Sequence, residues 1–98
     1  MIMNKEIFQE EVNKFLTNNG EDKVIFEDNI FIESNTFDTD EIMEEVSLFL
    51  NDLGLSSILA HTVTTLDGYN YILLEDENKE ELIGLSVIDE TGEVIVYN

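Results

Sequence analysis

The 98-residue sequence contains no cysteine, no proline and no arginine, and its cations are four lysines. Without cysteine the chain forms no disulfide and offers no thiolate as a nucleophile or metal ligand. No stretch approaches the roughly 18 apolar residues that a membrane-spanning helix needs. Residues 1–6 show no basic region followed by a long apolar run, so we expect no signal peptide. These absences favour a cytoplasmic protein.

Side chains that commonly carry out catalysis are scarce as well. The single histidine, His61, lies inside a predicted strand, and it shows no triad-like spacing with any serine. Segments 38–40 and 76–78 resemble the start of a calcium loop but lack the glycine and glutamate that complete one. A small carboxylate-dependent hydrolase stays open, because the many acids allow many carboxylate pairs. We expect a protein that is not an enzyme and has no cofactor and no dedicated metal site.

Negative charge is what the sequence has in abundance. There are 23 Asp and Glu residues, and the formal net charge is −19. Residues 1–23 hold three lysines and five acids, net −2, whereas residues 24–98 hold one lysine and 18 acids, net −17. In duplex DNA, 19 charges correspond to about 32 Å of helix axis. Such a field repels nucleic acid and attracts surfaces rich in Lys and Arg.

Apolar residues at three- and four-residue spacing predict two helices in one domain that covers residues 1–98. The first helix spans residues 4–19, with Asn4 as its N-cap and Gly20 as its stop. The second starts at Asp38, which has capping-box spacing to Glu41, and ends at Gly54.

Alternating apolar residues predict six strands, in the segments 23–27, 30–34, 57–66, 69–75, 82–89 and 93–97. The first two form either a tight hairpin or one long bulged strand, and we expect the hairpin. Asp67-Gly68 and Thr91-Gly92 are interpreted as two-residue turns of two further hairpins. We expect an α+β fold of order α-β-β-α-β-β-β-β, with both amphipathic helices packed on one face of an antiparallel sheet.

The predicted turns also fix a register. They place Val63 opposite Ile72 and His61 opposite Leu74, and they put Leu85 on the same face as Val94 and Val96.

Two acidic segments and two tyrosines are the candidate partner-binding residues. One segment belongs to the second helix, and the other is predicted to be a solvated loop. Tyr69 and Tyr71 are predicted on a partly open sheet face, where aromatic side chains anchor partners. The acidic candidates are Asp38, Asp40, Glu41, Glu44 and Glu45 in the helix, and Glu75, Asp76, Glu77, Glu80 and Glu81 in the loop.

In size and charge the whole chain resembles phage-encoded DNA mimics, which include anti-CRISPR proteins and restriction inhibitors. No diagnostic motif adds to this resemblance. It implies an inhibitor that occupies the basic nucleic-acid channel of a defence or DNA-handling protein. The alternative is an immunity protein that blocks the active site of a basic nuclease toxin. The oligomeric state is left open.

Overall fold

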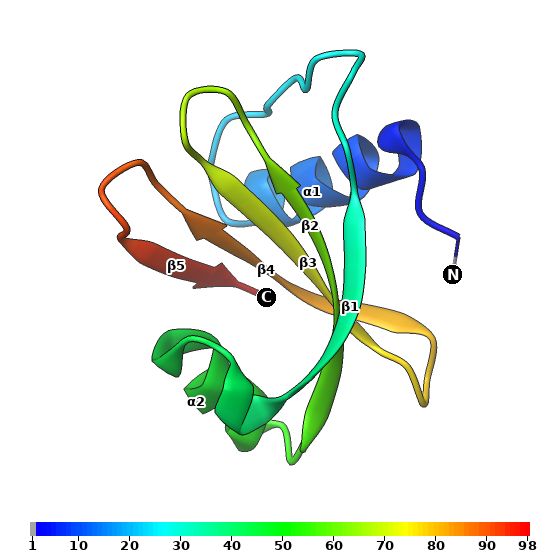
Figure 1. Ribbon diagram of the computed structural model, residues 1–98, viewed down its shortest axis with the longest axis vertical. Helices are drawn as coiled ribbons and strands as arrows, with labels where there is room; N and C mark the ends of the chain where they lie inside the picture. Colours follow the sequence, from blue (N-terminus) through cyan, green and yellow to red (C-terminus); the bar gives the residue numbers. More distant parts are fainter. Residues whose placement is uncertain (1) are drawn as a thin grey trace.

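The strand-forming segments pair in a five-stranded antiparallel sheet whose strands follow chain order (Figure 1). The computed structural model describes residues 2–98. The predicted α+β class and the antiparallel sheet are confirmed. The elements are α1 (Lys5–Asn18), β1 (Glu33–Asp38), the 3₁₀ turn η1 (Thr39–Glu41), α2 (Glu44–Asp52), β2 (Ser57–Thr64), β3 (Asn70–Asp76), β4 (Glu81–Ile88) and β5 (Val94–Tyr97).

The two helices cover opposite faces of this sheet, so the prediction that they share one face is wrong (Figure 1). Successive residues of a strand point to opposite sides, and Leu73 accordingly belongs to one core while Ile72 and Leu74 belong to the other. In the first core α1 contributes Phe8, Val12 and Leu16, which pack with Val63, Leu73 and Leu85. In the second α2 contributes Val46 and Leu50, which pack with Ile58, Ala60, Ile72 and Leu74.

The β2–β3 and β4–β5 turns explain part of this error, because each of these two turns holds three residues and not two. The N–H of Thr65 donates to the carbonyl of Tyr69 at 2.8 Å, so residues 66–68 form the first loop. The β4–β5 turn repeats the pattern around residues 90–92. The third residue of each loop is a glycine with positive φ, +90° at Gly68 and +88° at Gly92. A type I turn followed by a left-handed glycine gives this three-residue hairpin.

The longer turns shift the register by one residue. Val63 lies opposite Tyr71, not Ile72, and His61 lies opposite Leu73, not Leu74. In the last hairpin Leu85 likewise pairs with Tyr97, so Leu85 does not share a face with Val94 and Val96. A slip of one residue moves every side chain of a strand to the other face of the sheet.

The predicted cap and stop residues are confirmed for α1, but the predicted start of α2 is not. Asn4 caps α1, since its Oδ1 accepts from the N–H of Ile7 at 2.9 Å, and Gly20 follows with φ +78°. The second helix starts later than predicted. The N–H of Asp38 does donate to Glu41 Oε1 at 2.9 Å, but this contact closes the turn η1, and α2 begins only at Glu44.

The hairpin predicted before the second helix is also wrong, because residues 21–32 form no strand. Side-chain amides of α1 bind this segment instead. Asn13 Oδ1 accepts from the N–H of Val24 at 2.8 Å, and Gln9 Oε1 accepts from the N–H of Phe26 at 2.8 Å. Phe26 is buried against Phe8, with ring centroids 5.5 Å apart. The helix therefore supplies the hydrogen bonds that a partner strand would have supplied.

Candidate partner-binding surfaces

The predicted acidic residues divide into an exposed set and a buried pair. Glu75 and Asp76, expected in a solvated loop, are the last residues of β3 and are only 2% and 7% exposed. The prediction that these two residues lie in a solvated loop is therefore wrong. The exposed set is called the acidic end below, and it consists of Asp38, Asp40, Glu41, Glu44, Glu45, Glu77, Glu80 and Glu81.

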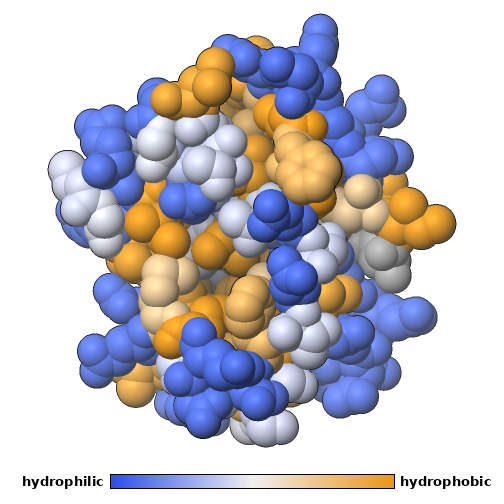
Figure 2. All heavy atoms as spheres, in the orientation of Figure 1, coloured by the Kyte–Doolittle hydropathy of each residue, from blue (hydrophilic) through white to orange (hydrophobic). Residues whose placement is uncertain are grey.

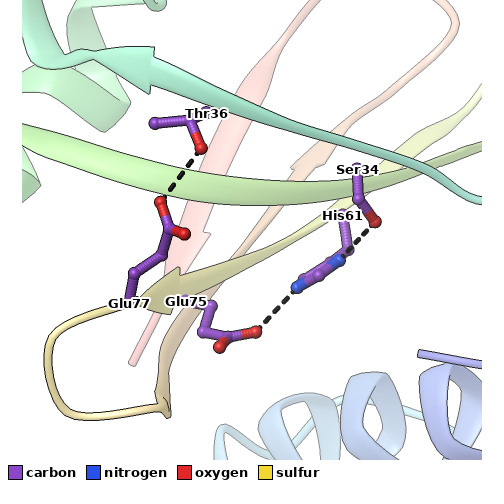
Figure 3. Close-up of polar contacts among 5 residues, drawn as sticks. All are labelled: Ser34, Thr36, His61, Glu75 and Glu77. Atoms are coloured by element: carbon purple, nitrogen blue, oxygen red, sulfur yellow. Dashed lines mark hydrogen bonds and ion pairs between the residues drawn. The ribbon is translucent and has the colours of Figure 1, made fainter. Parts of the chain in front are cut away.

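A hydrogen bond ties the two halves of the acidic end together. Thr36 Oγ1 donates to Glu77 Oε1 at 2.9 Å, although the two residues are 41 positions apart in the chain (Figure 3). In an antiparallel meander the end of β1 and the β3–β4 turn lie at the same end of the sheet, and Asp38 follows two residues after Thr36. Carboxylates from both predicted segments therefore lie at one end of the molecule.

Little positive charge balances these carboxylates. Lys5 Nζ lies 2.6 Å from Asp28 Oδ1, and this contact holds the pKa of Asp28 below its ordinary value. Lys14 pairs with Glu10 and Glu11 on α1. Among residues 2–98 no lysine lies within 4.0 Å of a carboxylate of the acidic end. Figure 2 shows hydrophilic side chains crowding the lower end of the molecule, where α2 lies.

A buried polar row crosses β1, β2 and β3 on the side of α1 (Figure 3). His61 Nε2 lies 2.8 Å from Glu75 Oε1, and His61 Nδ1 lies 2.6 Å from Ser34 Oγ. His61 and Glu75 are each 2% exposed, whereas Ser34 is exposed on the edge strand. A carboxylate only accepts hydrogen bonds, so the Nε2–H of His61 donates to Glu75, and Nδ1 is the ring nitrogen that faces the Ser34 hydroxyl.

This row has the order of a Ser-His-carboxylate triad with the two ring nitrogens exchanged, which the chain spacing did not indicate. A working triad also needs a substrate cavity beside the serine. A groove between residues 24–31 and the β2–β3 hairpin is lined by none of Ser34, His61 and Glu75. The row gives hydrogen-bond partners to two polar side chains that are buried in the sheet.

A groove of about 620 Å³ opens between residues 24–31 and the end of the β2–β3 hairpin. Two aromatic rings line its inner side. Phe26 and Tyr71 meet edge to face with centroids 5.1 Å apart, and Tyr69 stacks on Tyr71 at 6.2 Å. Tyr71 was predicted on an open face, which α1 in fact covers, but Tyr71 still reaches the groove. Burial disfavours the phenolate and raises the pKa of Tyr71, and the nearby Asp67 adds to the effect.

Three exposed apolar side chains also line the groove, and none of them was a candidate site residue. Ile25 is 87% exposed, Phe31 is 75% exposed and Leu66 is 91% exposed. Ile25 and Phe31 had been assigned to a hairpin, and Leu66 to the last residue of a strand. Glu27 and Asp67 add negative charge to the same lining.

Among residues 2–98 no group of three or more His, Asp and Glu side chains is placed to hold a metal ion. No helix within this part of the chain is long and apolar enough to cross a bilayer. Comparisons with models of known protein families, with curated proteins and with solved structures find no match for this chain.

Proposed function

We propose that the protein binds the basic, nucleic-acid-binding surface of a defence or DNA-handling protein and competes there with nucleic acid. The observation that carries this proposal is the acidic end, where eight exposed carboxylates from two distant segments lie together. Surfaces that hold DNA or RNA are rich in Lys and Arg. A dense group of carboxylates steers such a surface toward the protein and fits its charge.

The dimensions of the molecule support this competition. Its principal extents are 34 × 30 × 24 Å. The −19 charge is that of about 32 Å of duplex DNA, so charge per length along the longest axis is close to that of DNA. The protein can therefore offer a basic channel a similar charge over a similar distance.

The local structure of the acidic end supports it too. Glu44 and Glu45 lie in the first turn of α2, where the helix dipole stabilises negative charge. Glu80 in the β3–β4 turn has φ +53°, a conformation that glycine adopts at lower cost. A carboxylate is thus kept at a position where glycine would be less strained, and such strain is common at functional sites.

A pull-down tests the proposal with two variants of equal charge. One reverses four acids of the acidic end, Glu44→Lys, Glu45→Lys, Glu77→Lys and Glu80→Lys. The matched control reverses four exposed acids elsewhere, Glu10→Lys, Glu21→Lys, Asp22→Lys and Glu93→Lys. Each reversal adds two charges, so both variants carry −11 in place of −19. Lysate of the cells in which the protein acts is passed over each immobilised form at low salt and eluted with a salt gradient.

We expect the wild type and the control variant to retain a nucleic-acid-binding protein that salt releases and that duplex DNA displaces. The acidic-end variant should lose it. Equal loss in both variants would mean that overall acidity, not the acidic end, drives binding. A nuclease toxin retained through high salt would favour an immunity protein.

A further inference from the structure

Exposed apolar side chains are concentrated at the groove. Among residues 2–98 seven large apolar side chains are exposed, and three of them, Ile25, Phe31 and Leu66, line this one groove. Single exposed apolar residues are ordinary on a protein surface, but several around one hollow mark a binding site. The volume of about 620 Å³ falls within the range of pockets that bind ligands.

Both walls of the groove are held in place before any ligand arrives. On one wall, hydrogen bonds from the N–H groups of Val24 and Phe26 to α1 side chains fix residues 24–26. On the other, the 2.8 Å bond from the N–H of Thr65 to the carbonyl of Tyr69 closes the three-residue turn that carries Leu66. A preformed groove loses less entropy on binding than a mobile loop does.

The charge around the groove restricts what can enter it. Its two ionised lining side chains are Glu27 and Asp67, and it is lined by no lysine. Glu90 lies close by, because a Cβ on Gly68 would be 3.6 Å from the Cβ of Glu90. This field disfavours anionic ligands such as fatty acids and nucleotides, and it favours an apolar group with positive charge beside it.

We propose that the groove receives one large apolar side chain, Leu or an aromatic residue, that is flanked by Lys or Arg in a protein partner. This inference rests on the proposed function, because it takes the partner to be basic. The groove lies at the β2–β3 turn and the acidic end at the β3–β4 turn, so the seven residues of β3, about 23 Å of strand, separate them. A standard interface of about 800 Å² per partner is wide enough to cover both.

Two synthetic peptides of equal charge test the groove directly. Both are lysine-flanked; one has Leu-Phe at its centre and the other has Ser-Ser. We expect the Leu-Phe peptide to bind about tenfold or more tightly, which is the gain from burying one large apolar side chain. The ratio should persist in about 0.5 M NaCl, since salt screens charge and does not weaken apolar burial. Fluorescence anisotropy of labelled peptides measures both affinities.

Matched variants locate the effect. Phe31→Ser with Leu66→Ser should abolish the ratio between the two peptides. Leu48→Ser with Ile95→Ser should preserve it, because those side chains are exposed outside the groove. All four residues are exposed, so circular dichroism should show both variants folded. Equal binding of the two peptides to the wild type, or a ratio that survives in the Phe31/Leu66 variant, would overturn the groove proposal.

Failure of the groove is distinguishable from failure of the proposed function. Reversing the acidic end should weaken both peptides alike and leave their ratio unchanged. If the wild type binds the two peptides equally but still retains a partner in the charge-dependent pull-down, only the groove proposal is refuted. If the Leu-Phe peptide binds more tightly as expected but the pull-down retains no partner that salt releases and DNA displaces, only the proposed function is refuted.

Discussion

The net contribution of the buried pair His61–Glu75 to the free energy of unfolding should be smaller than the cost of removing either residue alone. The two side chains are 2% exposed and their interacting atoms are 2.8 Å apart. His61→Leu leaves the Glu75 carboxyl buried without this donor, and Glu75→Leu leaves the imidazole without this acceptor. A buried carboxylate that loses its partner costs about 3–5 kcal/mol, and a buried imidazole that loses its acceptor costs about 1–3 kcal/mol, whereas replacing both partners with apolar residues is close to neutral.

For a chain of 98 residues, 1 kcal/mol corresponds to about 4–8 °C in the melting temperature, so His61→Leu should melt at least about 12 °C lower and Glu75→Leu at least about 4 °C lower. The double variant should recover most of that loss. Urea unfolding of the wild type, the two single variants and the double variant gives the coupling free energy, which we expect to be about 2 kcal/mol or more. Effects that add to within about 0.5 kcal/mol would refute the argument that the pair is energetically coupled.

Four further predictions follow from single positions. Burial raises the pKa of Tyr71 in the folded protein, so the resulting stabilisation is complete below about pH 10 and is lost as the pH rises through the raised pKa. In thermal unfolding, Tyr71→Phe should therefore lose less stability at alkaline pH than the wild type does. Gly84→Ala should cost about 1–3 kcal/mol in urea unfolding, since the added Cβ would lie 3.0 Å from Phe49 Cε2; an unchanged midpoint would contradict this. Ser86→Ala should raise the free energy of unfolding by about 1 kcal/mol, because Ser86 Oγ is buried and finds no hydrogen-bond partner among residues 2–98. Ser34 should resist a fluorophosphonate probe, and covalent labelling detected by mass spectrometry would instead assign it a catalytic role.

Features set by neighbouring residues could be predicted from the sequence. The cap at Asn4 and the left-handed stop at Gly20 depend on residues within one helical turn, and the structure has both. The turn length at Gly68 was harder to predict, because an Asp-Gly pair suits both two- and three-residue loops. That one extra residue decides which side chains of β3 share a face with Val63, so a local ambiguity became an error in the register of the sheet.

Features set by distant residues were not predictable in this way. Val24 and Phe26 alternate like a strand, yet amides on α1 bind their N–H groups. Glu75 stands in an acidic run, but it is buried because His61, 14 residues earlier, lies beside it. The acidic composition of the sequence indicated the exposed carboxylates. The groove combines residues 24–31 with the β2–β3 hairpin, so it could be found only in the folded structure.

The meander has a consequence for how quickly the chain reaches its native state. Every strand pairs with the strand next to it in the sequence, and the longest link inside the sheet is the one through α2. Low sequence separation between paired segments favours rapid folding. Since the chain has no proline, prolyl isomerisation adds no slow phase. Refolding should therefore proceed in a single fast phase, and added salt should accelerate it by screening the repulsion among the carboxylates that collapse brings together.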